Sequence, residues 1–365
     1  MTSAGDDSKR VKGYEDLGVK VVKGGGRLAG PGRLTVVDQD FEADSILIST
    51  GSDPVIPPID GLPEAGYWTN REATSLHEIP ASVVVIGGGP VGIELAQFMR
   101  RFGSEVSIVQ GSERLAERED ERVSDLLGES LSADGVDVRT SVHAQGVRRD
   151  GDIRVVTLDD GSELRGEQVI VATGRRPRSH DIGLETIGVQ PAGHGGIPID
   201  DHCRVADGVW AAGDCTGVML FTHLAKYQAR VAMADMLGRP VDADYRAIPR
   251  VIFTDPEVAA VGLTEAQACE AGHDIAVATI SLPESIARPY TYEQDPRGEL
   301  SVIADRQRRV LLGAWAVAPQ ASEWIHQAVL AIRAEVALDI LLQTVAQFPS
   351  YTEGYLSALQ ALELG

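Results

Sequence analysis

Three glycines follow a run of β-branched residues, and their spacing suits a backbone that holds a phosphate group. The stretch VVVIGGGPVGIELAQ, residues 83–97, sets Gly87, Gly89 and Gly92 in the order G-x-G-x-x-G between an expected strand and an expected helix. The first glycine permits a tight turn, the second lets the backbone approach a pyrophosphate, and the third lets helix and strand pack closely. The helix N-terminus adds unpaired N–H groups and the positive end of a dipole. With a second expected strand at Glu105–Val109, the stretch predicts a dinucleotide-binding site rather than an ordinary strand-to-helix turn.

The residues after the second expected strand bear on which dinucleotide is bound. An NAD site usually carries Asp or Glu about 20 residues after the first glycine, where it binds the ribose 2′-hydroxyl. Gln110 stands at that place and can bond a ribose hydroxyl without repelling a 2′-phosphate. Arg114 can neutralise such a phosphate, whereas Glu113 can serve NAD from a neighbouring register. NAD and NADP both remain open.

Composition and charge exclude several classes of protein. The 365 residues suffice for two or three domains, and 33 Lys and Arg against 54 Asp and Glu give a net charge of −21. That charge argues against a nucleic-acid partner or an anionic membrane surface. No apolar run reaches membrane-spanning length, and the polar start is unlike a signal peptide, so a cytoplasmic protein is expected. Cys203, Cys215 and Cys269 form no close pair, which predicts unpaired thiols in a reducing compartment.

Two stretches of the chain repeat one another. Asp44–Pro54 and Glu167–Pro177 each contain an apolar strand, then Thr-Gly, then a proline three residues on. Polar hairpin-like sequence precedes each stretch, so each unit is expected to be a β-meander that returns a strand to a parallel sheet. Gly87 opens the second repeat and Gly174 closes it. Counting the same number of residues back from Gly51, which closes the first repeat, goes past the first residue of the chain. The first unit is therefore expected to lack its opening strand, glycine fingerprint and helix.

The sequence changes character after Arg246. Strands there alternate with one short helix, a strand hairpin follows, and two periodic helices are expected at Ser322–Ala334 and Val336–Thr344, with a last helix from about Thr352. Phe221–Leu237 is helical by pattern and precedes a Gly/Pro-containing boundary. A separate α+β domain is expected to follow that boundary.

The ordered set GGGPVGIEL, VIVATGRRP, WAAGDCTG, PRVIFTDPEVAAVGLTE and FPSYTE resembles the pyridine nucleotide-disulfide oxidoreductases over nearly the whole chain. The resemblance implies an α/β fold with two Rossmann-like nucleotide-binding domains, the first truncated at its N-terminus, and a C-terminal α+β dimerisation domain. The implied bounds are 1–75 and 178–245 for the FAD-binding domain, 76–177 for the NAD(P)-binding domain and 246–365 for the dimerisation domain. Such enzymes pass a hydride from a nicotinamide to FAD and electrons to an acceptor, as homodimers.

Several residues match positions that lie near the cofactors in this family. Gly213-Asp214 matches the second FAD motif, whose Asp accepts hydrogen bonds from the ribityl chain, a task suited to an ionised carboxylate. Thr222-His223 matches a position whose backbone faces the isoalloxazine ring, and a structural role is expected for the imidazole. Thr50, Gly51 and Gly174, which close the two repeated units, are also expected to bind cofactor.

Two glutamates are candidates for catalytic roles. Relatives pair the residue at Glu94 with a lysine beside the flavin, although a glutamate expected on the first helical turn also simply suits the dipole. Relatives place His-Pro and then Glu near the C-terminus as a base that acts across the dimer interface. Here Phe348 takes the histidine's place, and it cannot transfer a proton, so Glu353 has no imidazole to orient.

The family's redox cysteine pair is also absent from this sequence. Together with Phe348 in the histidine's place, its absence predicts an FAD-dependent NAD(P)H oxidoreductase that passes hydride from the flavin to a small non-disulfide acceptor. A quinone, a small electrophile or a second nicotinamide fits this description. Two alternatives stay open. One is a truncated, non-catalytic protein that keeps nucleotide-binding and dimerisation modules. The other is a fragment of a dihydrolipoamide dehydrogenase-like enzyme, left by a mis-assigned start or a split gene.

Overall fold

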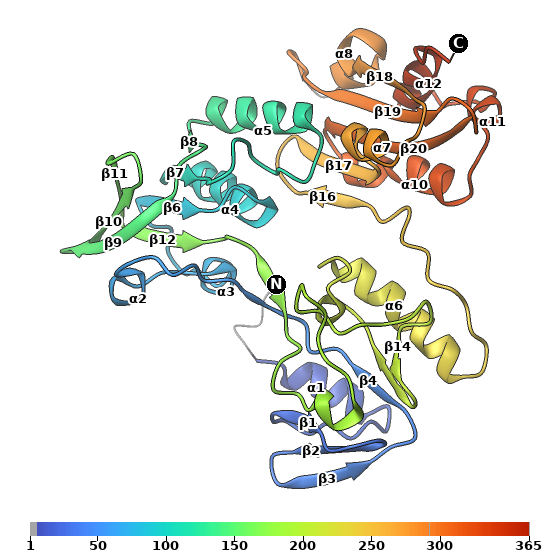
Figure 1. Ribbon diagram of the computed structural model, residues 1–365. Coiled ribbons are helices and arrows are strands. Elements are labelled where there is room, and N and C mark those ends of the chain that lie inside the picture. Colours follow the sequence, from blue (N-terminus) through green and yellow to red (C-terminus); the bar gives the residue numbers. More distant parts are fainter. Residues whose placement is uncertain (1–5, 292, 365) are drawn as a thin grey trace. The chain divides into compact units, whose positions relative to one another are not determined.

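The computed structural model describes residues 6–291 and 293–364, which form two compact units. Of the described residues, the first unit contains 6–56 and 174–244, and the second contains 57–173, 245–291 and 293–364. Figure 1 traces the elements of each unit in chain order.

The first unit combines small sheets with one long helix. Strands β1, β2 and β3 form an antiparallel meander, β4 pairs parallel with β15, and β14 pairs antiparallel with β15. The expected meander that returns a strand to parallel pairing is confirmed, as is the long helix, α6. The elements are α1 Ser8–Glu15, β1 Gly26–Leu28, β2 Arg33–Val36, β3 Gln39–Glu42, β4 Ile46–Ile48, β5 Ser52–Pro54, β13 Arg175–Pro177, η1 Leu184–Ile187, β14 Arg204–Ala206, β15 Val209–Ala211, η2 Asp214–Thr216 and α6 Thr222–Met236.

The segments that follow the two Thr-Gly pairs meet in the first unit. Strand β5 follows Gly51, β13 follows Gly174, and the two strands pair antiparallel. Both glycines have positive φ, 78° and 124°, a conformation that glycine adopts without a steric cost. The segments that end the two copies of the sequence repeat therefore pair with each other.

The second unit begins with a four-stranded parallel sheet in the order β12-β6-β7-β8. Four of the five residues of β6, Ser82–Ile86, are buried, as expected of a central parallel strand covered on both faces. One face packs on α4 and α5 through Val83, Val85, Ile93 and Leu127, while β11 lies against β6 on the other. The further elements are α2 Leu62–Ala65, α3 Asn70–Ala73, α4 Pro90–Arg101, β7 Glu105–Val109, α5 Glu121–Ala133, β8 Asp137–Arg139, β9 Ala144–Asp150, β10 Ile153–Leu158, β11 Glu163–Gly166 and β12 Gln168–Val171.

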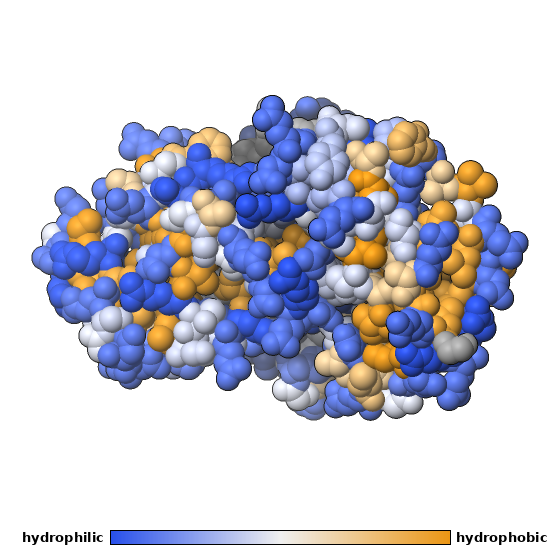
Figure 2. Space-filling view, turned by 90° about the horizontal axis from the view of Figure 1, so that it is seen from above, coloured by the Kyte–Doolittle hydropathy of each residue, from blue (hydrophilic) through white to orange (hydrophobic). Residues whose placement is uncertain are grey.

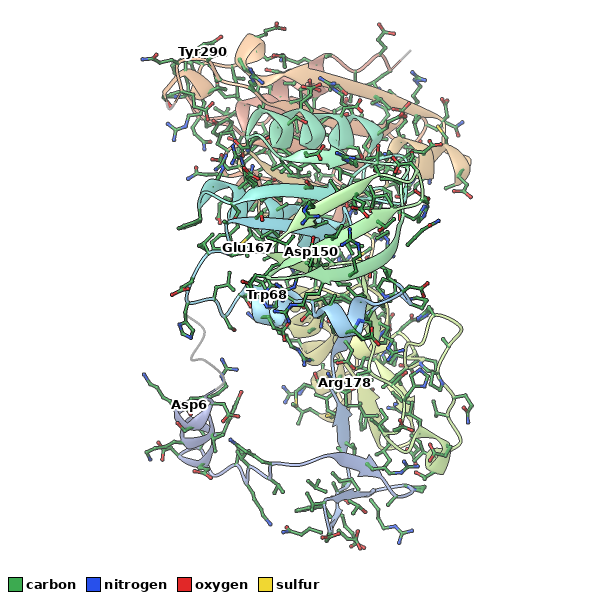
Figure 3. The ribbon with its side chains drawn as sticks, turned by 90° about the vertical axis from the view of Figure 1, so that its left-hand side faces the viewer. Asp6, Trp68, Asp150, Glu167, Arg178 and Tyr290 are labelled. Atoms are coloured by element: carbon green, nitrogen blue, oxygen red, sulfur yellow. The ribbon has the colours of Figure 1, made fainter. Side chains whose placement is uncertain are left out.

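An irregular segment extends this sheet at β12. Trp68 forms a parallel bridge with Ile170, and its N–H and carbonyl bond Val169 and Val171 at 2.8 Å each. Trp68 and the neighbouring Glu167 are labelled in Figure 3. The carboxylate of Glu167 accepts the backbone N–H of Ala81 at 2.8 Å, just before β6.

The C-terminal part of the second unit is a five-stranded antiparallel sheet in the order β16-β17-β20-β19-β18. All nine residues of β20 are buried, since helices α9 to α12 pack on one face while Trp315 and Val317 pack in a second cluster on the other. The helix expected over Ser322–Ala334 is instead two helices, because Ile325 is a boundary residue that belongs to neither. The elements are β16 Arg250–Ile252, β17 Glu257–Gly262, α7 Glu265–Glu270, β18 Ile275–Ser281, α8 Leu282–Ser285, η3 Arg288–Thr291, β19 Glu299–Asp305, β20 Val310–Ala318, α9 Ala321–Trp324, α10 His326–Arg333, α11 Leu338–Leu342 and α12 Glu353–Gln360.

The parallel and antiparallel sheets of the second unit share one hydrophobic core. Ile252, Val258 and Trp315 pack in the same cluster as Ile93 and Val123 of the parallel-sheet half. The Nε and Nη2 of Arg250 donate to the carboxylate of Glu119 at 2.9 Å, and both side chains are largely buried. This ion pair joins the antiparallel-sheet half of the unit to the parallel-sheet half. The antiparallel sheet after Arg246 thus packs on the parallel sheet within one compact unit.

The surface mixes hydrophilic and apolar residues. Hydrophilic residues are spread over the face seen in Figure 2, with apolar residues between them. Within residues 6–291 and 293–364, no helix has the length and apolar character needed to cross a membrane.

Candidate functional site

The glycine loop between β6 and α4 has the geometry that a dinucleotide requires. Gly87 has φ 116°, and a Cβ there would overlap the carbonyl of Ala172. A Cβ on Gly92 would overlap the carbonyl oxygen of Gly87, so only glycine lets α4 approach the loop this closely. Both positions are closed by backbone atoms, which cannot move aside as a flexible side chain can.

Gly89 differs from the other two glycines because space is open in front of it. It is the N-cap of α4, with φ −82° and ψ 177°, and a Cβ there would meet nothing within 4 Å. Pro90 occupies the first helical position, and the first turn holds no acidic residue. The residues present thus fit a pyrophosphate: an open cradle stands before the N–H groups of a twelve-residue helix.

The predicted coenzyme-selecting residues point back into the protein. The side-chain oxygen of Gln110 accepts the N–H of Gly88 at 2.8 Å, so this residue holds the glycine loop. The guanidinium of Arg114 donates to the carbonyls of Glu117 and Glu119 at 3.0 and 3.1 Å. Both side chains lie beside the predicted nucleotide site, but neither presents its polar group to it.

Glu94 lies in the second turn of α4, not the first as the sequence suggested, because the helix begins at Pro90. The dipole explanation is correspondingly weaker, since that effect is confined to the first turn. Its carboxylate accepts the backbone N–H of Phe253 at 2.9 Å, from the segment after β16. Burial raises the pKa of this carboxyl, while the Phe253 N–H opposes the shift.

Replacing Glu94 by glutamine is expected to stabilise the protein increasingly as the pH rises. A raised carboxyl pKa means that the folded state binds the proton more tightly than the unfolded chain. Wild-type stability is therefore lost as the pH rises from the ordinary value of 4.5 through the raised folded value. Glu94→Gln has no such loss and keeps an oxygen for Phe253. Urea unfolding of both proteins across this pH range is the measurement, and a difference that shrinks with rising pH would contradict the argument.

In the first unit, Asp214 lies at the centre of a small polar network. Its carboxylate accepts the hydroxyl of Ser52 at 2.5 Å, and that hydroxyl in turn accepts Nε of Arg175 at 2.8 Å. Arg175 also donates to the Ser52 carbonyl at 2.7 Å. The network joins η2 to the paired strands β5 and β13, so both ends of the repeat fix the carboxylate.

The glycines around this network are constrained as well. Gly213 has φ 89°, a Cβ there would approach Ala225 at 3.1 Å, and its N–H donates to the buried side-chain oxygen of Gln228 at 2.7 Å. Space is open at Gly51, where a Cβ would meet nothing within 4 Å. The Thr50 hydroxyl donates to the carbonyl of Arg178 at 2.5 Å. This acceptor-bearing loop fits hydroxyl groups such as those of a ribityl chain.

Thr222 and His223 begin α6, directly after Phe221. The imidazole of His223 stacks on the Phe221 ring, with centroids 5.0 Å apart and planes at 15°. Such stacking is consistent with the structural role predicted for this side chain.

Near the C-terminus, the carboxylate of Glu353 caps a loop. It accepts the N–H of Ser350 at 2.9 Å at the start of α12. Phe348, five residues before it in the chain, is 76% exposed and offers no ionisable group. The histidine–glutamate pair of the family has no counterpart in this geometry.

Sequence reasoning missed several residues that build these sites. Ser52 and Arg175 hold Asp214, Gln228 holds Gly213, and the Phe253 N–H faces Glu94. The one available signal was that Ser52 and Arg175 stand at the same place in the two repeated Thr-Gly-x-x-Pro stretches, directly after the glycine.

The parallel sheet and its glycine loop define a nucleotide-binding protein whose second unit contains a Rossmann-type part. Residues 7–229 match the family model described as pyridine nucleotide-disulphide oxidoreductase, and residues 248–359 match the dimerisation domain of the same proteins. The chain therefore belongs to the pyridine nucleotide-disulphide oxidoreductase family, whose cofactors are FAD and NAD(P)H.

Individual relatives support this membership. The mercuric reductase of Streptomyces lividans is 36% identical over 369 residues, covering 97% of this chain and 76% of the relative. The dihydrolipoyl dehydrogenase of Thermus scotoductus is 34% identical over 352 residues, covering 94% and 75%. The mercuric reductase of Bacillus cereus is 31% identical over 353 residues, and this chain spans only 56% of its length.

Solved structures agree with these matches. The HOCl-induced flavoprotein disulfide reductase RclA of Escherichia coli superposes with a TM-score of 0.88 at 27% identity, covering 97% of this chain and 82% of that one. LpdA of Mycobacterium tuberculosis gives a TM-score of 0.86 at 28% identity, covering 97% and 80%.

Proposed function

We propose that the chain acts in an FAD-dependent NAD(P)H oxidoreductase whose electrons go to a non-disulfide acceptor. When bound, FAD would supply the two-electron redox chemistry between the nicotinamide and the acceptor. The cradle at Gly89 would hold the nicotinamide dinucleotide, and Asp214 with its Ser52 partner would hold ribityl hydroxyls. With a quinone as acceptor, NAD(P)H and one proton give NAD(P)⁺ and the hydroquinone.

The observation that carries the choice of acceptor is the environment of Glu353. A dithiol–disulfide couple needs a base that can move thiol protons. Phe348 cannot do so, and Glu353 bonds a backbone N–H where an imidazole partner would be needed. An acceptor that takes its protons from water does not need this pair.

We infer that the C-terminal sheet forms a homodimer in this protein. The match to the dimerisation domain supports the inference, and so do large apolar side chains that stay exposed in this region. Leu330 is 66% exposed, Ile340 62% and Val345 92%. Apolar surface of this kind often marks a protein interface.

The proposal predicts a flavin whose colour reports electron flow. Protein purified with FAD should lose visible flavin absorbance when NADH or NADPH is added without oxygen, and a quinone should restore it faster than oxidised lipoamide does. Protein that retains no flavin would overturn the FAD assignment for this chain. Faster reoxidation by lipoamide would overturn the non-disulfide acceptor.

Asp214→Ala should weaken FAD binding about tenfold or more, because it removes a charged acceptor from ribityl hydroxyls. The retained flavin per protein after gel filtration measures this loss. Asp207→Ala is the matched control, an exposed carboxylate on the β14–β15 turn of the same unit. Equal flavin retention by both variants would contradict the role of Asp214.

A further inference from the structure

The imidazole of His143 lies beside the end of β7, the strand end near which the coenzyme's ribose usually binds. The segment after β7 continues from Gln110 to Gly111, which has no side chain. A Cβ built on Gly111 would lie 2.5 Å from Nε2 of His143. The imidazole therefore packs against the residue that follows Gln110, beside the strand end from which a ribose-binding side chain usually comes.

The segment that carries His143 is fastened to the same strand end. The N–H of Val142 donates to the carbonyl of Gln110 at 3.2 Å, and the N–H of Ser141 donates to the carbonyl of Ser112 at 2.9 Å. These bonds fix the ring's backbone relative to the glycine loop, which Gln110 also holds through Gly88. One hydrogen-bonded assembly therefore positions both the loop and the imidazole.

Asp159 orients the imidazole. Its carboxylate accepts the backbone N–H of His143 at 3.0 Å and faces Nδ1 at 3.1 Å. Because an ionised carboxylate only accepts hydrogen bonds, Nδ1 carries the proton, and Nε2 of the neutral ring is left as an acceptor. The side chain is 68% exposed, so a ligand can reach Nε2.

The charges nearby disfavour a 2′-phosphate. Ser112 donates its hydroxyl to the carboxylate of Glu117, and Arg114 is engaged with backbone carbonyls. The loop from 113 to 120 carries Glu113, Glu117, Glu119 and Asp120 against Arg114 and Arg118, and with Glu119 paired to Arg250 three carboxylates still face two guanidiniums. A phosphate placed here meets a net negative loop, whereas a neutral hydroxyl does not.

We propose that His143 is the residue that selects the coenzyme, accepting the adenosine 2′-hydroxyl at Nε2 and making the site specific for NADH over NADPH. This inference rests on the dinucleotide site of the proposed function. It assigns recognition to the segment between β8 and β9, outside the stretch in which the sequence located it.

Adenosine fragments test the inference without any flavin. Wild-type protein should bind 5′-AMP about tenfold more tightly than 2′-deoxy-5′-AMP or adenosine 2′,5′-bisphosphate, as expected for one well-placed hydrogen bond and an unfavourable charge. His143→Ala should remove the preference for 5′-AMP over its 2′-deoxy analogue, and His143→Arg should favour the bisphosphate. Isothermal titration calorimetry gives these affinities, and NADH and NADPH should follow the same order.

His273→Ala is the matched control. His273 faces Asp305 at 3.0 Å in a similar His–Asp pair on the C-terminal sheet, so its loss should leave the fragment preferences unchanged. An unchanged 2′-deoxy ratio in His143→Ala would overturn the assignment of His143 while leaving the proposed function intact. Protein that binds neither fragments nor NADH would overturn the dinucleotide site, and the inference with it.

Discussion

Gly87→Ala is expected to destabilise the second unit and to abolish binding of NADH. Alanine would have to keep φ near 116°, and its Cβ would overlap the carbonyl of Ala172, the residue that directly follows β12. The strained backbone conformation and the steric overlap each cost about 1 to 3 kcal/mol, so we expect the free energy of unfolding to fall by about 3 kcal/mol. Urea unfolding followed by circular dichroism measures the loss of stability, and calorimetry measures the binding of NADH.

Gly89→Ala separates binding from stability. Its φ of −82° suits alanine, and a Cβ meets nothing within 4 Å, so the folded protein should tolerate the change. The same Cβ would stand in the cradle where a pyrophosphate approaches, so binding of NADH should fall sharply. If Gly89→Ala binds NADH as the wild type does, the cradle is not the phosphate site.

The contrast between these glycines shows what the sequence predicts well. The turn at Gly87 and the close packing at Gly92 follow from local spacing, because strand, turn and helix are consecutive in the chain. Both Thr-Gly repeats were likewise readable, since each carries its own strand and turn. What the repeat did not predict is that β5 and β13 pair with each other.

Residues that depend on distant partners were harder to interpret. Gln110 was expected to face a ribose, but the N–H of Gly88, 22 residues away, takes its side-chain oxygen. Glu94 meets Phe253, which lies 159 residues further along the chain. No local sequence pattern predicts such contacts, because several distant groups could bond each side chain equally well and only the tertiary fold determines which one lies close to it.

His143 was missed for a related reason. It lies between β8 and β9, and its place at the end of β7 depends on the bonds from Ser141 and Val142 to that strand end. The sequence placed coenzyme selection within residues 110–114 because strand-end residues usually perform it. A glycine at 111 was the available sign that another element supplies the side chain.

Glu119→Ala is expected to cost about 3 to 5 kcal/mol of stability, the range for breaking a buried ion pair by removing one partner. Arg250 and Glu119 are only 16% and 10% exposed, and the lost carboxylate would leave the guanidinium with the carbonyl of Gly262 at 3.0 Å. Because this pair joins the parallel and antiparallel sheets, the loss should separate their unfolding transitions in urea.

The pair between Arg122 and Glu299 supplies the comparison for that loss. It joins the same two halves and is more exposed, with the arginine side chain 43% and the glutamate side chain 20% exposed, so Glu299→Ala should cost less, about 1 kcal/mol. Replacing the buried pair together, as Arg250→Met with Glu119→Leu, should recover most of the stability because no uncompensated charge remains. If Glu119→Ala costs as little as Glu299→Ala, the shared apolar core rather than the ion pair holds the two sheets together. If the double variant is as unstable as Glu119→Ala, the bidentate geometry itself is required, since the penalty of an unpaired guanidinium would then be absent.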